Sequence, residues 1–219
     1  MKCSEICALI EQEYGTEYAC DWDNVGLLAG RSTKEVKKIL LSLDATDEVV
    51  RMAAEGGYDM LITHHPMLFS AIKRVTDQDM NGRRLLELIR NDISYYAMHT
   101  NYDTRGMADL AARLMGLTEC AVLEEVKDGE GIGRVGKLPH PMTLRECGEQ
   151  VKVAYGIPNV RLFGNPDTQV SLVGICPGAG KSTMPLALGF GCDVYITGDI
   201  DHHTGIDAVD QGMCIIDAG

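Results

Sequence analysis

The sequence predicts an α/β protein of two similar lobes, each a mostly parallel sheet flanked by helices, with a metal-binding cleft between the lobes. Two observations predict this fold. Short apolar runs alternate with segments of helical periodicity, the pattern of βαβ units and a mostly parallel sheet. The alternation stops at residues 121–142, which are rich in glycine and acidic residues, and then resumes. We therefore expect domains at 1–120 and 121–219.

The first domain is expected to alternate helices and strands from its start. Apolar residues at helical spacing between Ile6 and Tyr14 predict the first helix. Thr46 is the expected N-cap of a helix that ends at Gly56. The other expected elements are strands at 39–43, 60–63 and 95–98 and helices at 83–89 and 107–117.

The second domain is expected to begin with a solvated connection and one irregular strand over 121–142. Thr143 is then the expected N-cap of a helix that runs to about Tyr155. The other expected elements are strands at 160–163, 170–176, 194–197 and 213–216, and helices that begin near 181 and cover 206–209.

A short internal similarity supports two related lobes. The segment Gly57-Tyr58-Asp59-Met60-Leu61-Ile62-Thr63 resembles Gly191-Cys192-Asp193-Val194-Tyr195-Ile196-Thr197. Each copy follows a predicted helix and leads into polar residues. A match of this length leaves both duplication and chance similarity open.

Composition excludes several classes of function. With 219 residues, 45% of them hydrophobic, the chain can bury a full core. The net charge of −12 argues against general nucleic-acid binding and against anionic membranes. No apolar stretch is long enough to span a bilayer, and no signal peptide is recognisable, so a cytoplasmic location is expected. The eight cysteines form no Cys-x-x-Cys pair and are expected to be buried free thiols.

Polar residues gather where the predicted strands end, and in parallel α/β sheets ligands bind beyond those carboxyl ends. A helix cap or turn would explain any one of these residues, but not the whole set. They are Asp44, His64-His65, the segment His99 to Asp103, Asp199 and Asp217.

The adjacent histidines predict a metal site. Neighbours on a strand point to opposite faces, so His64 and His65 are expected to flank two ions rather than chelate one. Asp103 would add a carboxylate oxygen, whereas His99 and Asn101 are expected to orient ligands or substrate. The alternative is a pair of exposed loop histidines.

One segment imitates a phosphate-binding loop. Gly178-Ala179-Gly180-Lys181-Ser182 follows a predicted strand and precedes a helix. The motif needs a glycine five residues before Gly180, where this chain has Ile175. We interpret the segment as a glycine turn at a helix start, a place that can still hold an anion.

The chain resembles the Nif-three-like dinuclear-metal proteins, which are also described as GTP cyclohydrolase I type 2 homologues, in the compact form without an inserted domain. The resemblance spans the chain and rests on four motifs: Trp22-Asp23-Asn24-Val25-Gly26-Leu27, Ile62-Thr63-His64-His65-Pro66, His99-Thr100-Asn101-Tyr102-Asp103, and Thr197-Gly198-Asp199 followed by His203.

This resemblance implies a toroidal homohexamer with two divalent ions per site, held by His64, His65 and Asp103, with Asp199 and His203 lining the same cleft. In the family, the last strand leads to a Gly-His pair and then a glutamate, both contributing metal ligands. Here the chain stops at Gly219, so a fragment of a longer protein is expected.

The resulting expectation is a metal-dependent hydrolase, of the GTP cyclohydrolase kind, that acts on a nucleotide or another phosphorylated small molecule. His99 or His203 would move the proton, and Asp44, Asn101 and Asp199 would support ligands or substrate. Zn, Mn, Fe, Co or Ni would suit these donors. The alternatives are a non-enzymatic metal-binding regulator or scaffold, and a protein for metal storage or delivery.

Overall fold

The computed structural model describes residues 1–219, which divide into two compact units, Met1–Tyr102 and Asp103–Gly219. The division falls earlier than the expected boundary at residue 120. The reason is that helix α5 (Ala108–Leu114) belongs to the second unit, where Ala111 and Met115 are part of the main core.

The first unit is built on a four-stranded sheet in the order β1-β4-β3-β2. Strands β2, β3 and β4 run parallel, and β1 pairs antiparallel with β4 at one edge. The elements are α1 (Cys3–Glu13), β1 (Gly26–Ala29), β2 (Ile39–Ser42), α2 (Asp47–Glu55), β3 (Met60–Thr63), α3 (Met80–Arg90), β4 (Ser94–Ala97) and the short turn α4 (Thr100–Tyr102).

The second unit contains a six-stranded sheet in the order β5-β6-β8-β9-β10-β7. After a π-helical turn (Asp103–Met107) and α5, its elements are β5 (Thr118–Lys127), β6 (Glu130–Thr143), α6 (Leu144–Tyr155), β7 (Arg161–Phe163), β8 (Gln169–Ile175), α7 (Met184–Gly189), β9 (Val194–Thr197), α8 (His202–Asp210) and β10 (Cys214–Asp217). Only β8, β9 and β10 run parallel; the other neighbouring pairs are antiparallel.

The predicted α/β class is confirmed, whereas the second sheet is mixed rather than mostly parallel. Residues expected to form a solvated connection make the long antiparallel hairpin β5–β6 instead. Its turn is Asp128-Gly129, with φ of 53° and 79°, the left-handed pair that favours a tight hairpin. Of the acidic residues that suggested a loop, Glu124 and Glu125 are exposed in β5, Asp128 lies in the turn and Glu130 begins β6.

The two units share one plan, which supports the internal similarity seen in the sequence. Each has a helix, an antiparallel edge strand and three parallel strands in the same spatial order. The Asp59 carboxylate accepts hydrogen bonds from the backbone N–H groups of Lys37 and Lys38. The Asp193 carboxylate does the same for Ser171 and Leu172. Matching aspartates thus tie the middle strand to its neighbour in both units.

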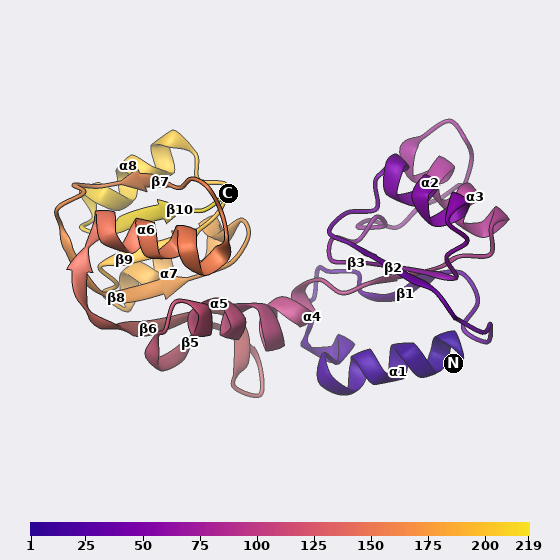
Figure 1. Ribbon diagram of the computed structural model, residues 1–219, viewed down its shortest axis with the longest axis horizontal. Helices are drawn as coiled ribbons and strands as arrows, with labels where there is room; N and C mark the ends of the chain where they lie inside the picture. The colour runs from indigo at the N-terminus through magenta and orange to yellow at the C-terminus, as the bar shows by residue number, and fades with distance from the viewer. The chain divides into compact units, whose positions relative to one another are not determined.

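Helices cover both faces of the first sheet, with α2 and α3 on one side and α1 on the other (Figure 1). Successive residues of β4 face opposite layers, as expected of a strand. Tyr95 packs into the core beneath α2 and α3, and Tyr96 packs against Cys3 and Cys7 of α1.

The second sheet is also covered on both faces. Val194 and Ile196 of β9 share a core with residues of α5 and α6, whereas Tyr195 faces the layer of α7 and α8. Strands β4, β9 and β10 are buried along their full length, because covering helices exclude water from both sides.

Local signals account for the helix boundaries. The side chain of Thr46 caps α2 by accepting from the N–H of Val49, as predicted. Thr143 and Glu146 form a reciprocal capping box at the start of α6, which ends at Gly156 in the left-handed conformation. The glycine turn near Lys181 is a short 3₁₀ turn (Gly180–Ser182) ahead of α7, and Lys181 pairs with Asp201.

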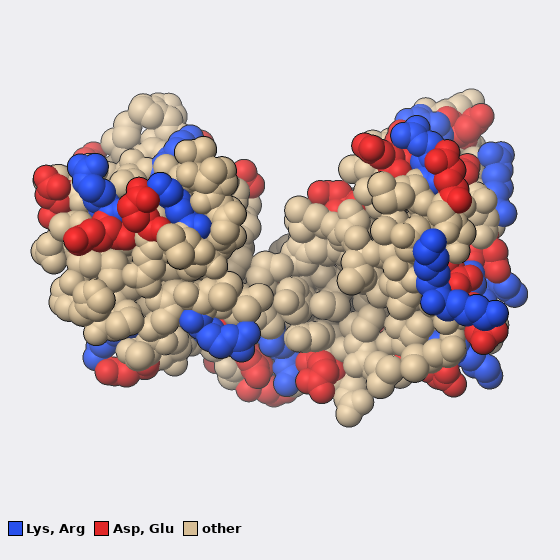
Figure 2. Space-filling model, in the orientation of Figure 1, with Lys and Arg blue, Asp and Glu red and all other residues tan.

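Charged side chains of both signs share the surface that Figure 2 draws. On the face drawn in Figure 2, lysine and arginine side chains are interspersed with aspartate and glutamate in both units. Six of the eight cysteines are buried, Cys20 is partly buried and Cys120 is exposed. No helix has the length and apolarity to cross a membrane.

Candidate metal centre

Three histidines converge at the carboxyl ends of two neighbouring strands in the first unit. His64 and His65 follow β3, and His99 follows β4, with which β3 pairs in parallel. One ring nitrogen from each lies within 4.8 Å of the others. Small adjustments of the side chains would bring three such nitrogens to the spacing of ligands on one ion, so this cluster could hold a metal ion.

His64 and His65 were expected to point to opposite faces of the sheet, but their rings lie together. Their ring centroids are 5.0 Å apart, and the His99 ring lies 5.1 Å from His64 and 5.6 Å from His65. Strand β3 ends at Thr63, so both histidines occupy the bend before Pro66, where strict alternation no longer applies.

Each ring is held through its Nδ1 atom by an oxygen acceptor. His64 Nδ1 bonds to the carbonyl of Met98 at 2.9 Å, and His65 Nδ1 bonds to Asp44 Oδ1 at 2.9 Å. His99 Nδ1 lies 3.0 Å from both oxygens of Asp23. A neutral imidazole that donates from Nδ1 carries its lone pair on Nε2, as in metal-binding histidines.

Asp23 is the central support of this arrangement. Its side chain is fully buried and also accepts from the backbone N–H of Asn24 and from the N–H and hydroxyl of Thr100. Burial alone would raise the pKa of Asp23, but the bonds from His99, Thr100 and Asn24 outweigh it and lower the pKa to about 2. Asp23 is therefore an anion beneath the cluster.

His64 is kept neutral by its surroundings. Burial, aided by the nearby His99 and His65 rings, lowers the pKa of His64 to about 4, although the bond to Met98 opposes the shift. A neutral imidazole is the form that binds metals, so the site does not need to expel a proton near pH 7.

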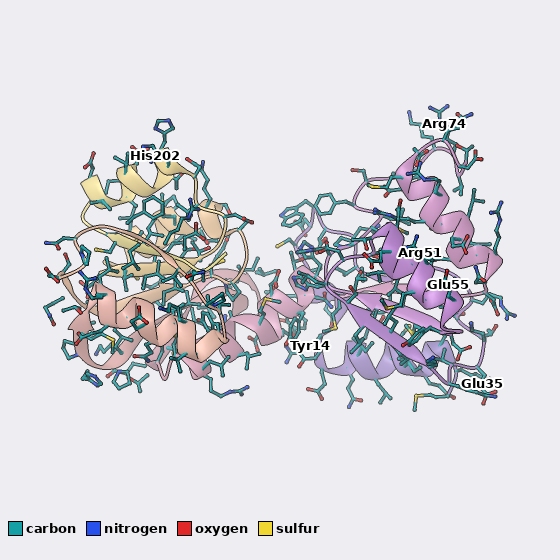
Figure 3. The ribbon with its side chains drawn as sticks, turned by 45° about the horizontal axis from the view of Figure 1, so that its top comes forward. Tyr14, Glu35, Arg51, Glu55, Arg74 and His202 are labelled. Atoms are coloured by element: carbon teal, nitrogen blue, oxygen red, sulfur yellow. The ribbon has the colours of Figure 1, made fainter.

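The other residues expected in the site have different positions. Asp44 contacts His65, and both side chains are about half exposed. Asn101 is fully buried, and its side-chain amide donates to the carbonyl of Tyr14 at the end of α1. Tyr14 is labelled in Figure 3. Asp103 opens the second unit as the first residue of its π-helical turn.

Asp199 and His203 also belong to the second unit. Asp199 follows β9, is exposed, and has a left-handed backbone with φ of 56°. His203 lies in the first turn of α8 beside His202, with ring centroids 5.5 Å apart, and His202 projects outward from that helix (Figure 3). Asp217 is nearly fully buried and paired with Arg161.

The donor set fits a divalent transition metal. Three neutral imidazoles, two of them backed by carboxylates, match the nitrogen ligands that zinc, iron and their neighbours accept. Sequence reasoning anticipated the histidines but assigned no role to Asp23. The available signal was its place in the Trp22–Leu27 motif, one of the four that carry the family resemblance.

Comparison with known proteins agrees with this fold. The chain is 34% identical to a GTP cyclohydrolase 1 type 2 homolog of Clostridium perfringens, covering all of this chain and 85% of that protein. A protein related to NIF3 from Bacillus cereus has a TM-score of 0.92 at 25% identity, covering 88% of that chain. Reduced HcgD from Methanocaldococcus jannaschii has a TM-score of 0.85 at 30% identity, covering 86% of its chain.

The family profile of DUF34/NIF3 (NGG1p interacting factor 3) matches residues 1–219. A match over the whole length, together with relatives above 30% identity, settles the assignment. The chain belongs to the DUF34/NIF3 family.

Proposed function

We propose that the protein is a metal-dependent hydrolase whose reaction takes place at the histidine cluster. The observation that carries this proposal is the common anchoring of His64, His65 and His99 through Nδ1, which directs Nε2 of each ring to a ligand role. Metal-ligating histidines almost always make such a hydrogen bond through the ring nitrogen that does not bind the ion.

The proposed division of labour follows from the contacts. His64, His65 and His99 hold the ion, and Asp23 and Asp44 fix two of the rings and increase their basicity. A bound divalent ion supplies Lewis acidity, which acidifies water and polarises the bond under attack. We reassign His99 from proton transfer to the ligand set because one of its ring nitrogens lies in the cluster with those of His64 and His65. His203 remains the proposed proton carrier.

A second ion is part of the proposal on sequence grounds. Asp103 follows His99 by four residues, and its carboxylate is the hard oxygen donor that a two-ion site requires. Asp199 and Asn101 remain proposed supports for ligands or substrate. The metal would be Zn, Mn, Fe, Co or Ni, and the assembly a homohexamer.

The proposed substrate is a nucleotide or another phosphorylated small molecule. The name shared by the curated relatives, GTP cyclohydrolase 1 type 2 homolog, supports a nucleotide. The net negative charge of the chain does not attract anions, so local contacts and the bound ion would have to hold the phosphate.

A second candidate is a metal-binding regulator or scaffold without catalytic activity. The family description, NGG1p interacting factor 3, names an interaction rather than a reaction and favours this alternative. Under it, His64→Ala would remove metal and partner binding with no turnover to lose.

The deciding experiment is turnover by zinc- and manganese-loaded protein on a panel of nucleotides and phosphoesters. We expect hydrolysis that His64→Ala abolishes and that His140→Ala, an exposed histidine of the second unit, leaves unchanged. Metal-loaded protein that turns over no member of the panel would contradict the hydrolase proposal.

A further inference from the structure

We propose that Trp22 and Phe69 form an aromatic platform beside the histidine cluster, and that this platform holds the planar heteroaromatic ring of the molecule bound there. The inference rests on the proposed function for the cluster as a small-molecule site. It goes further by naming the part of the ligand that is recognised and the two side chains that recognise it.

The platform lies directly against the cluster. The Trp22 and Phe69 ring centroids are 5.7 Å apart, with their planes tilted by 40°. Both rings also meet the His99 ring nearly edge to face, at 6.1 Å for Trp22 and 6.4 Å for Phe69. A ligand whose reacting group reaches the cluster would therefore have its next few atoms beside these aromatic rings.

Both platform residues expose about half of their surface. Trp22 is 58% exposed and Phe69 50%, in a chain with one tryptophan and three phenylalanines. Met67 and Leu68, just before Phe69, are buried in the core of the first unit, so the chain turns Phe69 outward after burying its neighbours. Large apolar side chains exposed together beside a polar site are typical of ligand contact.

The platform is fixed by the same contacts that fix the cluster. The side-chain amide of Asn24 donates to the carbonyl of Leu68, which joins the Trp22 segment to the Phe69 loop. The buried carboxylate of Asp23 binds the backbone of Asn24 and both the ring of His99 and the backbone of Thr100. Preorganisation of this kind lowers the entropy lost when a ligand binds.

The chemistry of the platform favours a planar ring over a flexible or charged group. Two tilted aromatic rings, each about half exposed, offer π-faces against which a third ring can stack at 4.5–7 Å. Stacking of a nucleobase on an aromatic side chain strengthens binding about 5- to 150-fold and needs no basic residue. Because the protein carries a net negative charge, its overall charge does not attract a phosphorylated ligand, and stacking would supply affinity in its place.

The test uses Trp22 as its own reporter, because it is the only tryptophan. Zinc-loaded and metal-free protein are titrated with AMP, GMP, CMP and UMP, and with ribose 5-phosphate as the matched ligand without a base. We expect saturable quenching of Trp22 emission by at least one nucleotide and none by ribose 5-phosphate. Quenching by no nucleotide, or equally by ribose 5-phosphate, would overturn the platform.

Calorimetric titration of variants with the tightest nucleotide completes the test. Trp22→Ala and Phe69→Ala are expected to weaken binding about 5- to 150-fold, the range that base stacking implies. Trp22→Phe, which keeps a π-face, should retain most of the affinity. Phe190→Ala is the control, since Phe190 is a 48% exposed phenylalanine of the second unit. Equal affinity in all four variants would refute the proposal.

Zinc content, measured in every sample, separates this proposal from the proposed function. Full zinc binding without nucleotide quenching would overturn the platform and leave the metal site standing. Absence of zinc would overturn the metal site, and the metal-free titration would still decide the platform. A Trp22 emission that shifts on dilution and ignores nucleotide would show that a second copy covers the pair, which also overturns the proposal.

Discussion

Substitution of Asp23 by asparagine is the sharpest test of how the site is supported. The Asp23 carboxylate accepts from His99 Nδ1 at 3.0 Å, from the N–H of Asn24 at 2.8 Å, and from the N–H and hydroxyl of Thr100. Every partner is a donor. An asparagine has one acceptor oxygen, so its NH₂ group would face donors on the other side.

The expected cost follows from that mismatch. At least one buried N–H, of Asn24 or Thr100, loses its acceptor at about 1–3 kcal/mol, and the remaining bonds lose the help of the negative charge. We expect Asp23→Asn to lower the free energy of unfolding by about 2–4 kcal/mol. Zinc affinity should fall about 10- to 100-fold, because the His99 ring is no longer held by an anion.

Denaturant unfolding followed by Trp22 fluorescence measures the stability change, since the only tryptophan is the neighbouring residue. Asp21→Asn is the matched control: Asp21 is exposed, and its loss should change stability by less than about 0.5 kcal/mol. An Asp23→Asn variant that unfolds within about 0.5 kcal/mol of the wild type would refute the role assigned to Asp23.

Two further predictions concern the fold. Hydrogen bonds from the backbone N–H groups of Lys37 and Lys38 lower the pKa of Asp59. The stability that the ionised Asp59 carboxylate contributes is therefore present above the ordinary aspartate pKa of about 3.9. It is lost as the pH falls through the lowered pKa. Asp59→Asn should therefore destabilise the protein at pH 7, with a difference from wild type that shrinks below about pH 4; a constant difference would contradict this. Arg134 is 5% exposed and bonds to Asp109 and to the carbonyls of Gly131 and Gly133. By calorimetry, Arg134→Ala should lower the free energy of unfolding by about 2–3 kcal/mol. The control Lys137→Ala, at an exposed side chain, should lower it by less than about 0.5 kcal/mol. Equal losses in the two variants would count against the contacts assigned to Arg134.

Elements with strong local signals could be predicted from the sequence. Strand β3 has the predicted bounds, because an apolar run lies between a helix-ending glycine and polar residues. Helix α6 begins after Thr143 as predicted, because a capping box is encoded within four residues. These elements depend on neighbours in the chain, which a sequence displays directly.

Features that depend on distant partners could not be predicted in the same way. Strand β1 is four residues long and is defined by pairing with β4, far along the chain. The β5–β6 hairpin was not recognised because exposed acidic residues and glycines resemble a loop, although Asp128-Gly129 signalled its turn. Asp23 acquires its role from His99 and Thr100, 76 and 77 residues away. The strand-end histidines were foreseen, but their shared anchoring through Nδ1 is a tertiary property.

The most direct test of the central claim is the metal content per subunit, measured by elemental mass spectrometry after dialysis against zinc. The account predicts about one to two equivalents in the wild type and in His140→Ala, and their loss in His64→Ala. A wild type without stoichiometric metal, or a His64→Ala variant that keeps as much as the wild type, would contradict it.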